Sequence, residues 1–563
     1  MTSSTPSRTA AQALVDQLVI HGVRHIFCVP GESFLAVLDA LRDSSIALTV
    51  CRQEGGAAMM AEAVGKATGR PGVCFVTRGP GATNASAGVH IAHQGSTPMV
   101  LFVGQVDRSV KDRDAWQELD LRAVFGSLTK WTAEVADPDR ITEYVSRAFH
   151  VAMAGQPGPV VLGLPHDILA LASRAAEAPR AEPAEISPGA AEMQALEGLL
   201  SEAERPFVLL GGGRWTEAAR AETATFAERF GLPVATGFRR LSLFDPLHPN
   251  YAGDLGLGAN PRLVARAKAA DLFIAVGGRL SEVTTQAYEL FDVPAPAAKL
   301  VHVFPGPDEL GRVWAPRLSI CATPSRFAAA LEGLRPSAIR WRGAAAAAHA
   351  EYLAWSETAT PQPGPVNPGQ VMAWLRENLP ADAILCNGAG NFTGWIHRFY
   401  RVRRFGGHFA PNSGSMGYGV PAAVAMQRLN PGRTVVAVSG DGDFLMNGQE
   451  LATAAQYGLP IIVIVFDNAS YGTIRMHQER EFPGRVVATD LKSPDFAAYA
   501  RAFGGFGATV ERTDDFPAAF EAARAAAVHA IVHVKFATDA ISPGQTLSAV
   551  RAHALAESSE RRP

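Results

Sequence analysis

Two side chains with oxygen ligands stand in a setting that suits magnesium chemistry. Asp441 lies between Gly440 and Gly442, and Asn468 follows after a further 25 residues. Carboxylate and amide oxygens are ligands that Mg²⁺ accepts, and Mg²⁺ in proteins is often shared with a phosphate group. Glycines beside the carboxylate allow the backbone to approach a phosphate closely. The spacing therefore predicts a site for a magnesium ion and a diphosphate.

The segments around these residues must bring them together. We expect a buried strand at 435–438, a tight turn at the glycines, an amphipathic helix through Gln456 and a second buried strand at 461–466. Two parallel strands joined by a right-handed crossover end at the same edge of the sheet, where ligands bind in open α/β sheets. Asp441 and Asn468 should then meet in space. The plainer interpretation is a glycine turn and an Asn cap between two core strands.

Composition describes an ordinary globular protein of several domains. The chain has 563 residues, 47% hydrophobic and 19% charged residues, and a net charge of −3. This length suggests three or four domains, and the absence of a basic surplus argues against nucleic-acid binding. The 5 cysteines include no CxxC pair, which predicts reduced thiols, a cytoplasmic location and no structural zinc. The N-terminal residues suggest neither a signal peptide nor a membrane span.

The order of segments predicts repeated α/β units. In residues 1–172, apolar strands alternate with helical segments, which indicates a parallel sheet with helices on both faces. A linker rich in Ala, Pro and Glu at 173–191 leads to a second α/β domain at 190–340. Its glycine triplet at 211–213 follows a strand; a tight turn is the favoured interpretation over a nucleotide site, since a full GxGxxG pattern is missing.

A second change in composition precedes a third α/β domain. Five alanines at 344–348 and a segment rich in proline at 361–369 predict another linker. The third domain is then expected at 365–537. The tail at 538–563 shows little periodicity, which fits either a mobile lid or a disordered end.

Longer motifs reveal a resemblance to a known family. Five motifs follow one another along nearly the whole chain: RQEGGAAMMAEAVGKATGRPGVCFVTRGPGATNA, DAWQELD, LTKW, GSMGYGVPAA and finally the magnesium-type motif. Together they resemble the thiamine diphosphate (ThDP)-dependent superfamily, in its acetolactate synthase-like and 2-oxo acid decarboxylase group. The resemblance implies three consecutive doubly wound parallel-sheet domains, which bind the pyrimidine, form the centre and bind the diphosphate.

The resemblance also assigns roles to individual residues. It implies that Glu54 is the catalytic carboxyl group, which hydrogen-bonds N1′ of the cofactor's aminopyrimidine. Met416 is implied as the apolar wedge that bends the cofactor, and the carbonyl of Gly414 as the acceptor for its 4′-amino group. Asp441, Asn468 and the carbonyl of Ser470 would bind Mg²⁺. The other residues implied to contact the cofactor are Pro30, Thr77, Asn84, Gly390, Asn391, Gly440, Gly442, Asp443, Tyr471, Gly472 and Thr473.

The family arrangement implies a partner subunit. In family members the pyrimidine domain of one chain faces the diphosphate domain of another, so that Glu54 and Asp441 of one site come from different subunits. A homodimer or homotetramer follows, with no nucleic-acid or membrane partner. The small-molecule substrate is expected to be a 2-oxo acid or an aldehyde-type compound.

Several positions depart from acetolactate synthases. Glu32 and Ser33 stand where those enzymes carry small residues, and Val283 aligns with the arginine that binds their acceptor 2-oxo acid. Asp443 places a further negative charge beside the diphosphate, which is unfavourable unless it points away or meets a cation. Asp467 replaces the first Asn of the usual Asn-Asn pair. The candidate substrate-pocket residues are Glu32, Ser33, Arg78, Trp116, Gln117, Thr473, Ile474 and His477.

These observations lead to one functional hypothesis with three alternatives. The favoured hypothesis is a lyase or ligase that depends on ThDP and Mg²⁺, acts on carbon–carbon bonds and is acetolactate synthase-like without being a true acetolactate synthase. The first alternative is a pyruvate-oxidase-like oxidoreductase with FAD in the central domain. The others are a genuine acetolactate synthase and a ThDP-binding scaffold without turnover.

Overall fold

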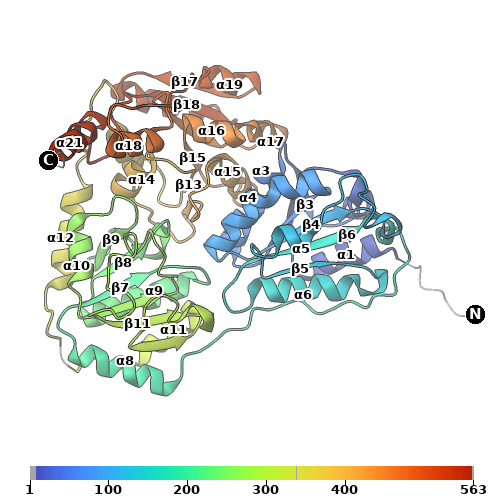
Figure 1. Ribbon diagram of the computed structural model, residues 1–563, viewed down its shortest axis with the longest axis horizontal. Helices are drawn as coiled ribbons and strands as arrows, with labels where there is room; N and C mark the ends of the chain where they lie inside the picture. The colour runs from blue at the N-terminus through green and yellow to red at the C-terminus, as the bar shows by residue number, and fades with distance from the viewer. Residues whose placement is uncertain (1–7, 338, 561–563) are drawn as a thin grey trace, which may run out of the picture. The chain divides into compact units, whose positions relative to one another are not determined.

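The computed structural model describes residues 8–337 and 339–560 and contains three parallel β-sheets of six strands each (Figure 1). The ends of the predicted first domain and tail, residues 1–7 and 561–563, lie outside the described residues. In Figure 1 the blue and cyan sheet, the green sheet and the orange and red sheet follow one another along the chain. The described residues form two compact units, of which one contains the first sheet and the other contains the second and third. The predicted fold class is confirmed.

The first sheet has its topological switch point between β1 and β3. Its strand order is β2 (Ala47–Val50), β1 (His25–Cys28), β3 (Gly72–Val76), β4 (Met99–Gln105), β6 (Pro159–Pro165), β5 (Trp131–Glu134). Its helices are α1 (Ala10–Ile20), α2 (Leu35–Arg42), α3 (Glu54–Thr68), α4 (Gly79–Gly95), α5 (Leu121–Phe125), α6 (Ile141–Met153) and α7 (His166–Leu169). Strands β3, β4 and β6 are buried along their whole length, which explains their unbroken apolar sequences.

The second sheet has the same topology, with its switch point between β7 and β10. Its strand order is β12 (Leu318–Cys321), β11 (Lys299–Phe304), β10 (Leu272–Val276), β7 (Pro206–Leu210), β8 (Val234–Gly237), β9 (Tyr251–Leu255). Its helices are α8 (Ala190–Glu202), α9 (Glu217–Phe230), α10 (Pro261–Lys268), α11 (Pro324–Ala330) and α12 (Ala344–Ser356). The run of alanines expected to be a linker is therefore the start of α12. This helix packs on β9, where Tyr352 meets Tyr251 with ring centroids 4.8 Å apart.

The third sheet places its switch point between β13 and β15. Its strand order is β14 (His408–Phe409), β13 (Ile384–Asn387), β15 (Val435–Gly440), β16 (Ile462–Asp467), β18 (Ala530–Lys535), β17 (Phe506–Val510). Its helices are α13 (Pro368–Asn378), α14 (Thr393–Phe399), α15 (Gly419–Leu429), α16 (Asp441–Asn447), α17 (Leu451–Gln456), α18 (Gly472–Glu481), α19 (Phe496–Ala502) and α20 (Phe516–Ala525). The single helix expected after Gly442 is two helices, α16 and α17, joined by a 3₁₀ turn at Gly448–Glu450.

The tail after Ala537 contains regular structure that its sequence did not indicate. Residues Leu547–Glu560 form helix α21. Arg551 of this helix forms two hydrogen bonds with the fully buried carboxylate of Glu479 on α18. Its Nη2 donates to Oε1, and its Nε donates to Oε2 at 2.7 Å. Since the carboxylate has no contact with solvent, this bidentate pair anchors α21 to α18.

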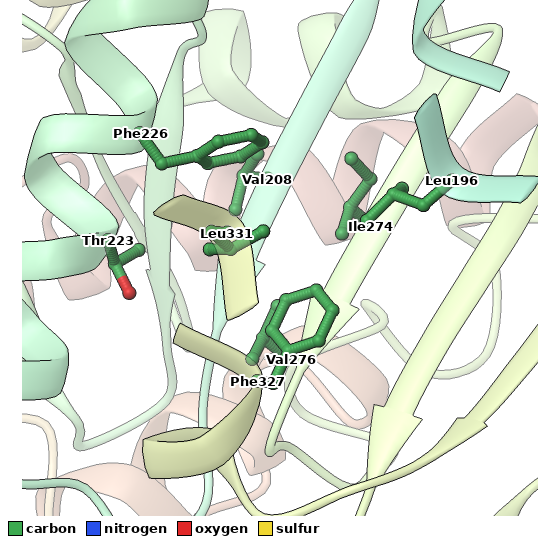
Figure 2. Close-up of a pocket in the computed structure, with 8 residues that line it drawn as sticks. All are labelled: Leu196, Val208, Thr223, Phe226, Ile274, Val276, Phe327 and Leu331. Carbon is green, nitrogen blue, oxygen red and sulfur yellow. The ribbon is translucent and has the colours of Figure 1, made fainter. Parts of the chain in front are cut away.

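The cavity in the central sheet's core is too small for a ligand. Figure 2 shows its lining, to which strands of the sheet and the helical segments packed against them both contribute. The lining residues are Leu196, Val208, Thr223, Phe226, Ile274, Val276, Phe327 and Leu331. Its volume of about 10 Å³ is at the limit of what one water molecule needs. It is a packing gap in an apolar core.

No helix within residues 8–337 and 339–560 is long and apolar enough to cross a membrane.

A buried histidine at the end of α1 makes the first unit sensitive to acid. His21 stacks on Phe149 of α6 at 4.4 Å, and its Nδ1 accepts a hydrogen bond from the N–H of Ala181 at 3.1 Å. Burial, followed by the positive charges of His150, Arg70 and Arg180, lowers the pKa of His21 to about 4. The folded chain therefore favours the neutral imidazole.

Replacing His21 with Gln is expected to flatten the pH dependence of stability below neutrality. Because the folded pKa lies below the ordinary value of 6.5, the contribution of His21 is complete above pH 6.5 and is lost as the pH falls toward 4, by up to roughly 3 kcal/mol. The variant should be less stable at pH 7.5 and lose less stability on acidification. Thermal unfolding from pH 7.5 to 4.5 measures this; His553→Gln, on an exposed side chain, should keep the wild-type slope.

Candidate cofactor-binding and active site

The predicted magnesium ligands lie together at the switch point of the third sheet. Asp441 is the first residue of α16, directly after β15, and Asn468 directly follows the adjacent strand β16. The Asp441 carboxylate accepts hydrogen bonds from the N–H groups of Gly442 at 2.9 Å and Ser470 at 3.1 Å. Asp441, Asn468 and Ser470 are all buried. The expected meeting of the two strand ends is confirmed, while the metal role of these residues stays a prediction.

A second buried carboxylate, that of Asp467, lies beside Asp441 at this strand edge. Burial, and then the neighbouring Asp467, raises the pKa of Asp441 to about 7. Burial would also raise the pKa of Asp467, but hydrogen bonds with His533, the Ala469 N–H and Ser493 outweigh it and hold that pKa at about 2. His533 Nε2 lies 2.8 Å from Asp467 Oδ2. Asp467 is therefore the carboxylate that ionises first, and it opposes the ionisation of Asp441. A divalent cation bound by Asp441 would favour the ionised form of this carboxylate.

The predicted ligand set is not of the His and Cys type. In residues 8–337 and 339–560, no group of three or more His, Cys, Asp or Glu side chains is arranged to hold a metal ion. A carboxylate, an amide and a main-chain carbonyl form a hard oxygen set that leaves positions for phosphate and water. That is the set Mg²⁺ prefers, so the residues present fit the predicted ion.

Glycine is needed at three positions of the site, for two different physical reasons. A Cβ atom on Gly442 would lie 2.5 Å from the ring of Tyr471, and one on Gly390 would lie 2.9 Å from Phe392. Gly414 instead has φ +71°, and a Cβ there would meet nothing within 4 Å. Packing therefore requires glycine at the first two positions. At Gly414 the backbone conformation requires it, in a loop with open space beside it.

The loop after β13 is bound to the start of α18. The Asn391 N–H donates to Thr473 Oγ1 at 3.0 Å, and the Thr473 hydroxyl donates to Asn391 Oδ1 at 3.0 Å. Gly472 lies so close to Asn468 that a Cβ atom would sit 3.1 Å from the Asn468 amide nitrogen. The candidate cofactor residues of the third sheet thus form one connected group across three neighbouring strand ends.

Asp443 meets a cation that the sequence did not indicate. Asp443 Oδ1 accepts hydrogen bonds from the N–H groups of Ala389 and Gly417, both at 2.9 Å. Burial raises the pKa of Asp443 to about 6, against these hydrogen bonds, a hydrogen bond with the Ser439 side chain and the positive charge of Arg239. Burial lowers the pKa of Arg239 to about 10, so the guanidinium stays charged at neutral pH. Arg239 follows β8 of the second sheet, and only its position after a strand could have singled it out.

The first unit gathers its candidate residues at the switch point between β1 and β3. Glu54 is the first residue of α3, and its Oε2 accepts a hydrogen bond from the Asn84 amide at 2.9 Å. Ser33 Oγ, after β1, lies 2.9 Å from Thr77 Oγ1, after β3. Pro30, two residues after the end of β1, is exposed. Five of the predicted residues therefore share one strand edge.

The same edge carries an ion pair between two candidate pocket residues. Arg78 Nη1 donates to Glu32 Oε1 at 3.0 Å, with the Arg78 side chain 12% exposed and the Glu32 side chain 68% exposed. Arg78 is the residue before α4, which also begins beside the Gln117 carbonyl, since the Gly79 N–H donates to it at 2.9 Å. The pair presents both a cation and an anion at the switch point.

Other candidates lie at the surface of their own units. Trp116 is 76% exposed, which rules out simple packing as its role within the first unit. In the second unit Ile474 and His477 are exposed on α18, and Met416 is half-buried beyond Gly414. These side chains are open to a ligand or to another chain.

The glycine triplet of the central domain is explained by packing. A Cβ on Gly212, after β7, would lie 1.6 Å from the carbonyl oxygen of Gly277, after β10, and one on Gly211 would lie 2.9 Å from Gly278. The two loops at this switch point therefore touch backbone to backbone, which favours the tight-turn interpretation.

Comparison with known proteins agrees with the three sheets. Residues 8–124 match the thiamine pyrophosphate enzyme N-terminal TPP binding domain, residues 193–331 the central domain, and residues 388–534 the C-terminal TPP binding domain. The chain belongs to the thiamine pyrophosphate (ThDP) enzyme family and is an enzyme of the acetolactate synthase type.

Its curated relatives include acetolactate synthases from bacteria and plants. The acetolactate synthase large subunit of Parasynechococcus marenigrum is 33% identical, over 89% of this chain and 83% of the relative. The acetolactate synthase isozyme 2 large subunit of Escherichia coli is 31% identical, over 91% and 92%. The probable chloroplastic acetolactate synthase 2 of Oryza sativa is 32% identical, over 92% and 81%.

Proposed function

We propose that this enzyme uses ThDP with Mg²⁺ to break or form a carbon–carbon bond in a 2-oxo acid or aldehyde-type substrate, and that it is not a true acetolactate synthase. The observation that carries the proposal is the ion pair of Arg78 and Glu32 beside Ser33 and Thr77. It introduces charge where acetolactate synthases carry small residues, while Val283 replaces their acceptor-binding arginine.

The cofactor and the residues of this chain would divide the chemistry between them. When bound, ThDP supplies a carbon nucleophile and an electron sink for bond cleavage beside a carbonyl group. Asp441, Asn468 and the Ser470 carbonyl would hold Mg²⁺ against the diphosphate. Glu54, oriented by the Asn84 amide, would hold a proton at N1′ of the aminopyrimidine. Met416 would fix the angle between the two rings.

Arg78 supports recognition of a substrate carboxylate. A guanidinium group binds carboxylates through two parallel hydrogen bonds, and Arg78 keeps one donor, Nε, without a partner within the described part of the chain. Glu32 orients the guanidinium from the solvent side. A 2-oxo acid matches this charge, and Val283 removes the second carboxylate anchor that a condensation of two 2-oxo acids would use.

The active site is proposed to form between subunits of a cytoplasmic homodimer or homotetramer. The exposed Trp116 of the first unit and the exposed Ile474 of the second suit surfaces that another copy covers. Analytical ultracentrifugation with and without ThDP and Mg²⁺ tests this; a monomer under both conditions would contradict it.

A substrate panel tests the proposed reaction. Purified protein with ThDP and Mg²⁺ is incubated with single 2-oxo acids and with 2-oxo acid and aldehyde pairs, and products are identified by carbon dioxide release and mass spectrometry. We expect decarboxylation or ligation of at least one 2-oxo acid and little acetolactate from pyruvate. Efficient acetolactate formation would overturn the distinction from acetolactate synthases.

The Arg78→Met variant is expected to lose discrimination in favour of carboxylates. Removing a charge-assisted bidentate contact should lower kcat/KM for the preferred 2-oxo acid by about 10-fold to 100-fold, mainly through KM. Steady-state kinetics with a 2-oxo acid and a neutral aldehyde measure this. Arg140→Met, which breaks a surface ion pair with Glu143 in the same unit, is the control. Equal losses for both substrates would contradict the carboxylate role.

A further inference from the structure

Arg239 is a buried arginine at the carboxyl edge of the central sheet. It follows β8 by two residues, is 4% exposed, and has φ +60°. A residue with a Cβ atom seldom adopts this backbone region, and such residues concentrate at functional sites. Its guanidinium lies over the ring of Phe238 at 4.7 Å. Burying a charge in this way requires a compensating partner.

Two reciprocal hydrogen bonds join this segment to the loop that carries the cofactor residues Gly414 and Met416. Arg239 Nη1 donates to the carbonyl oxygen of Pro411. The side-chain amide of Asn412 donates to the carbonyl oxygen of Phe238 at 3.1 Å. The central domain thus holds the base of the 411–416 loop.

The negative charge of Asp443 acts on the buried Arg239, and the Asp443 carboxylate binds the N–H of Gly417, directly after the 411–416 loop. Asp443 is buried and interacts electrostatically with Arg239. Its Oδ1 binds the N–H groups of Ala389 and Gly417, so one carboxylate spans the loop after β13 and the loop that contains Met416. The carboxylate also interacts with the side chain of Ser439. Within the described residues, Arg239 Nε has no hydrogen-bond partner.

We propose that Arg239 is a positioning residue for ThDP, a role that rests on the proposed function: its charge allows Asp443 to stay buried between the two cofactor loops and so sets their separation. Asp443 would otherwise place an uncompensated negative charge beside the diphosphate. In this arrangement the central domain contributes directly to the shape of the cofactor site. Arg239 itself touches neither substrate nor reacting atoms.

A charge-neutralising pair of substitutions tests the proposal. ThDP affinity is measured by calorimetry in Mg²⁺, and thermal unfolding of the cofactor-free protein is measured in parallel, for wild type, Arg239→Met, Asp443→Asn and the double variant. We expect Arg239→Met to weaken ThDP binding by about 10-fold to 100-fold. Adding Asp443→Asn, which keeps an oxygen acceptor for Ala389 and Gly417, should restore most of the affinity. Arg239→Lys, which retains the charge, should bind ThDP more tightly than Arg239→Met.

The controls separate this role from general destabilisation and from the proposed reaction. Arg266→Met breaks the ion pair with Glu351 in the same domain and should bind ThDP as tightly as wild type. No substrate is present, so the result does not depend on which 2-oxo acid is used. If Arg239→Met does not fold, Asp443→Asn and Arg239→Lys carry the test. Unchanged affinity in Arg239→Met, absence of rescue in the double variant, or equal losses in Arg239→Lys and Arg239→Met would each overturn the proposal.

Discussion

The Asp441→Ala variant is expected to bind ThDP in Mg²⁺ at least about 100-fold more weakly than wild type, since changes to groups that merely support a metal ligand already cost 10-fold to 100-fold. The carboxylate lies at the end of β15, beside Asn468 and the Ser470 N–H. Alanine would remove both the proposed ligand oxygen and the negative charge that would attract the cation. Isothermal titration calorimetry with ThDP at fixed Mg²⁺ measures the change.

The cofactor-free Asp441→Ala protein should stay folded and be at least as stable as wild type above pH 7. Burial and Asp467 raise the folded pKa of Asp441 to about 7, so ionising this group weakens the folded state as the pH rises from the ordinary value of 3.8 through 7. Removing it relieves that repulsion. Asp382→Ala, at an exposed side chain of the same domain, is the matched control. Unchanged ThDP affinity in Asp441→Ala would remove this residue from the metal site.

The fold and the strand-end residues could be predicted because their causes are local in sequence. A strand buried on both faces must be apolar throughout, so the strands expected at 435–438 and 461–466 fall within two residues of the observed bounds of β15 and β16. In a parallel sheet the residue after each strand then falls on one edge. Asp441 and Asn468 followed from that rule without any contact information.

Other features depend on contacts between distant residues and leave no pattern. The sequence indicated that a negative charge at Asp443 is unfavourable beside a diphosphate. It did not indicate the cation, because Arg239 follows a strand of another sheet, 204 positions earlier in the chain. His533 orders Asp467 from β18 in the same way. Composition was misleading at α12, whose alanines form a helix packed on β9. It was also misleading at α21, where Arg551 pairs with the buried carboxylate of Glu479.

Glu54→Gln is expected to lower kcat by about 10²-fold to 10⁴-fold, the usual range for losing a general acid or base. The structure places the Glu54 carboxyl group at the start of α3, with Oε2 bound to the Asn84 amide and Oε1 facing Gly81, where a Cβ would lie 3.5 Å away. Glutamine has nearly the same shape and can keep the bond to Asn84, but it cannot exchange a proton with N1′. Single-turnover kinetics with the substrate identified by the panel measure the loss.

The same substitution at Glu62, just over two turns further along α3, separates chemistry from structure. Glu62 is fully buried, accepts a hydrogen bond from Thr97 at 2.8 Å and pairs with Lys66 at 3.0 Å. Glu62→Gln removes the buried carboxylate that pairs with Lys66, so it should lower the unfolding temperature while kcat of the folded fraction stays near wild type. Glu54→Gln should do the opposite, keeping the unfolding temperature and ThDP affinity while losing turnover. If Glu54→Gln retains wild-type kcat, the carboxyl group at this strand edge is not the proton-transfer group, and Asn84 merely caps it.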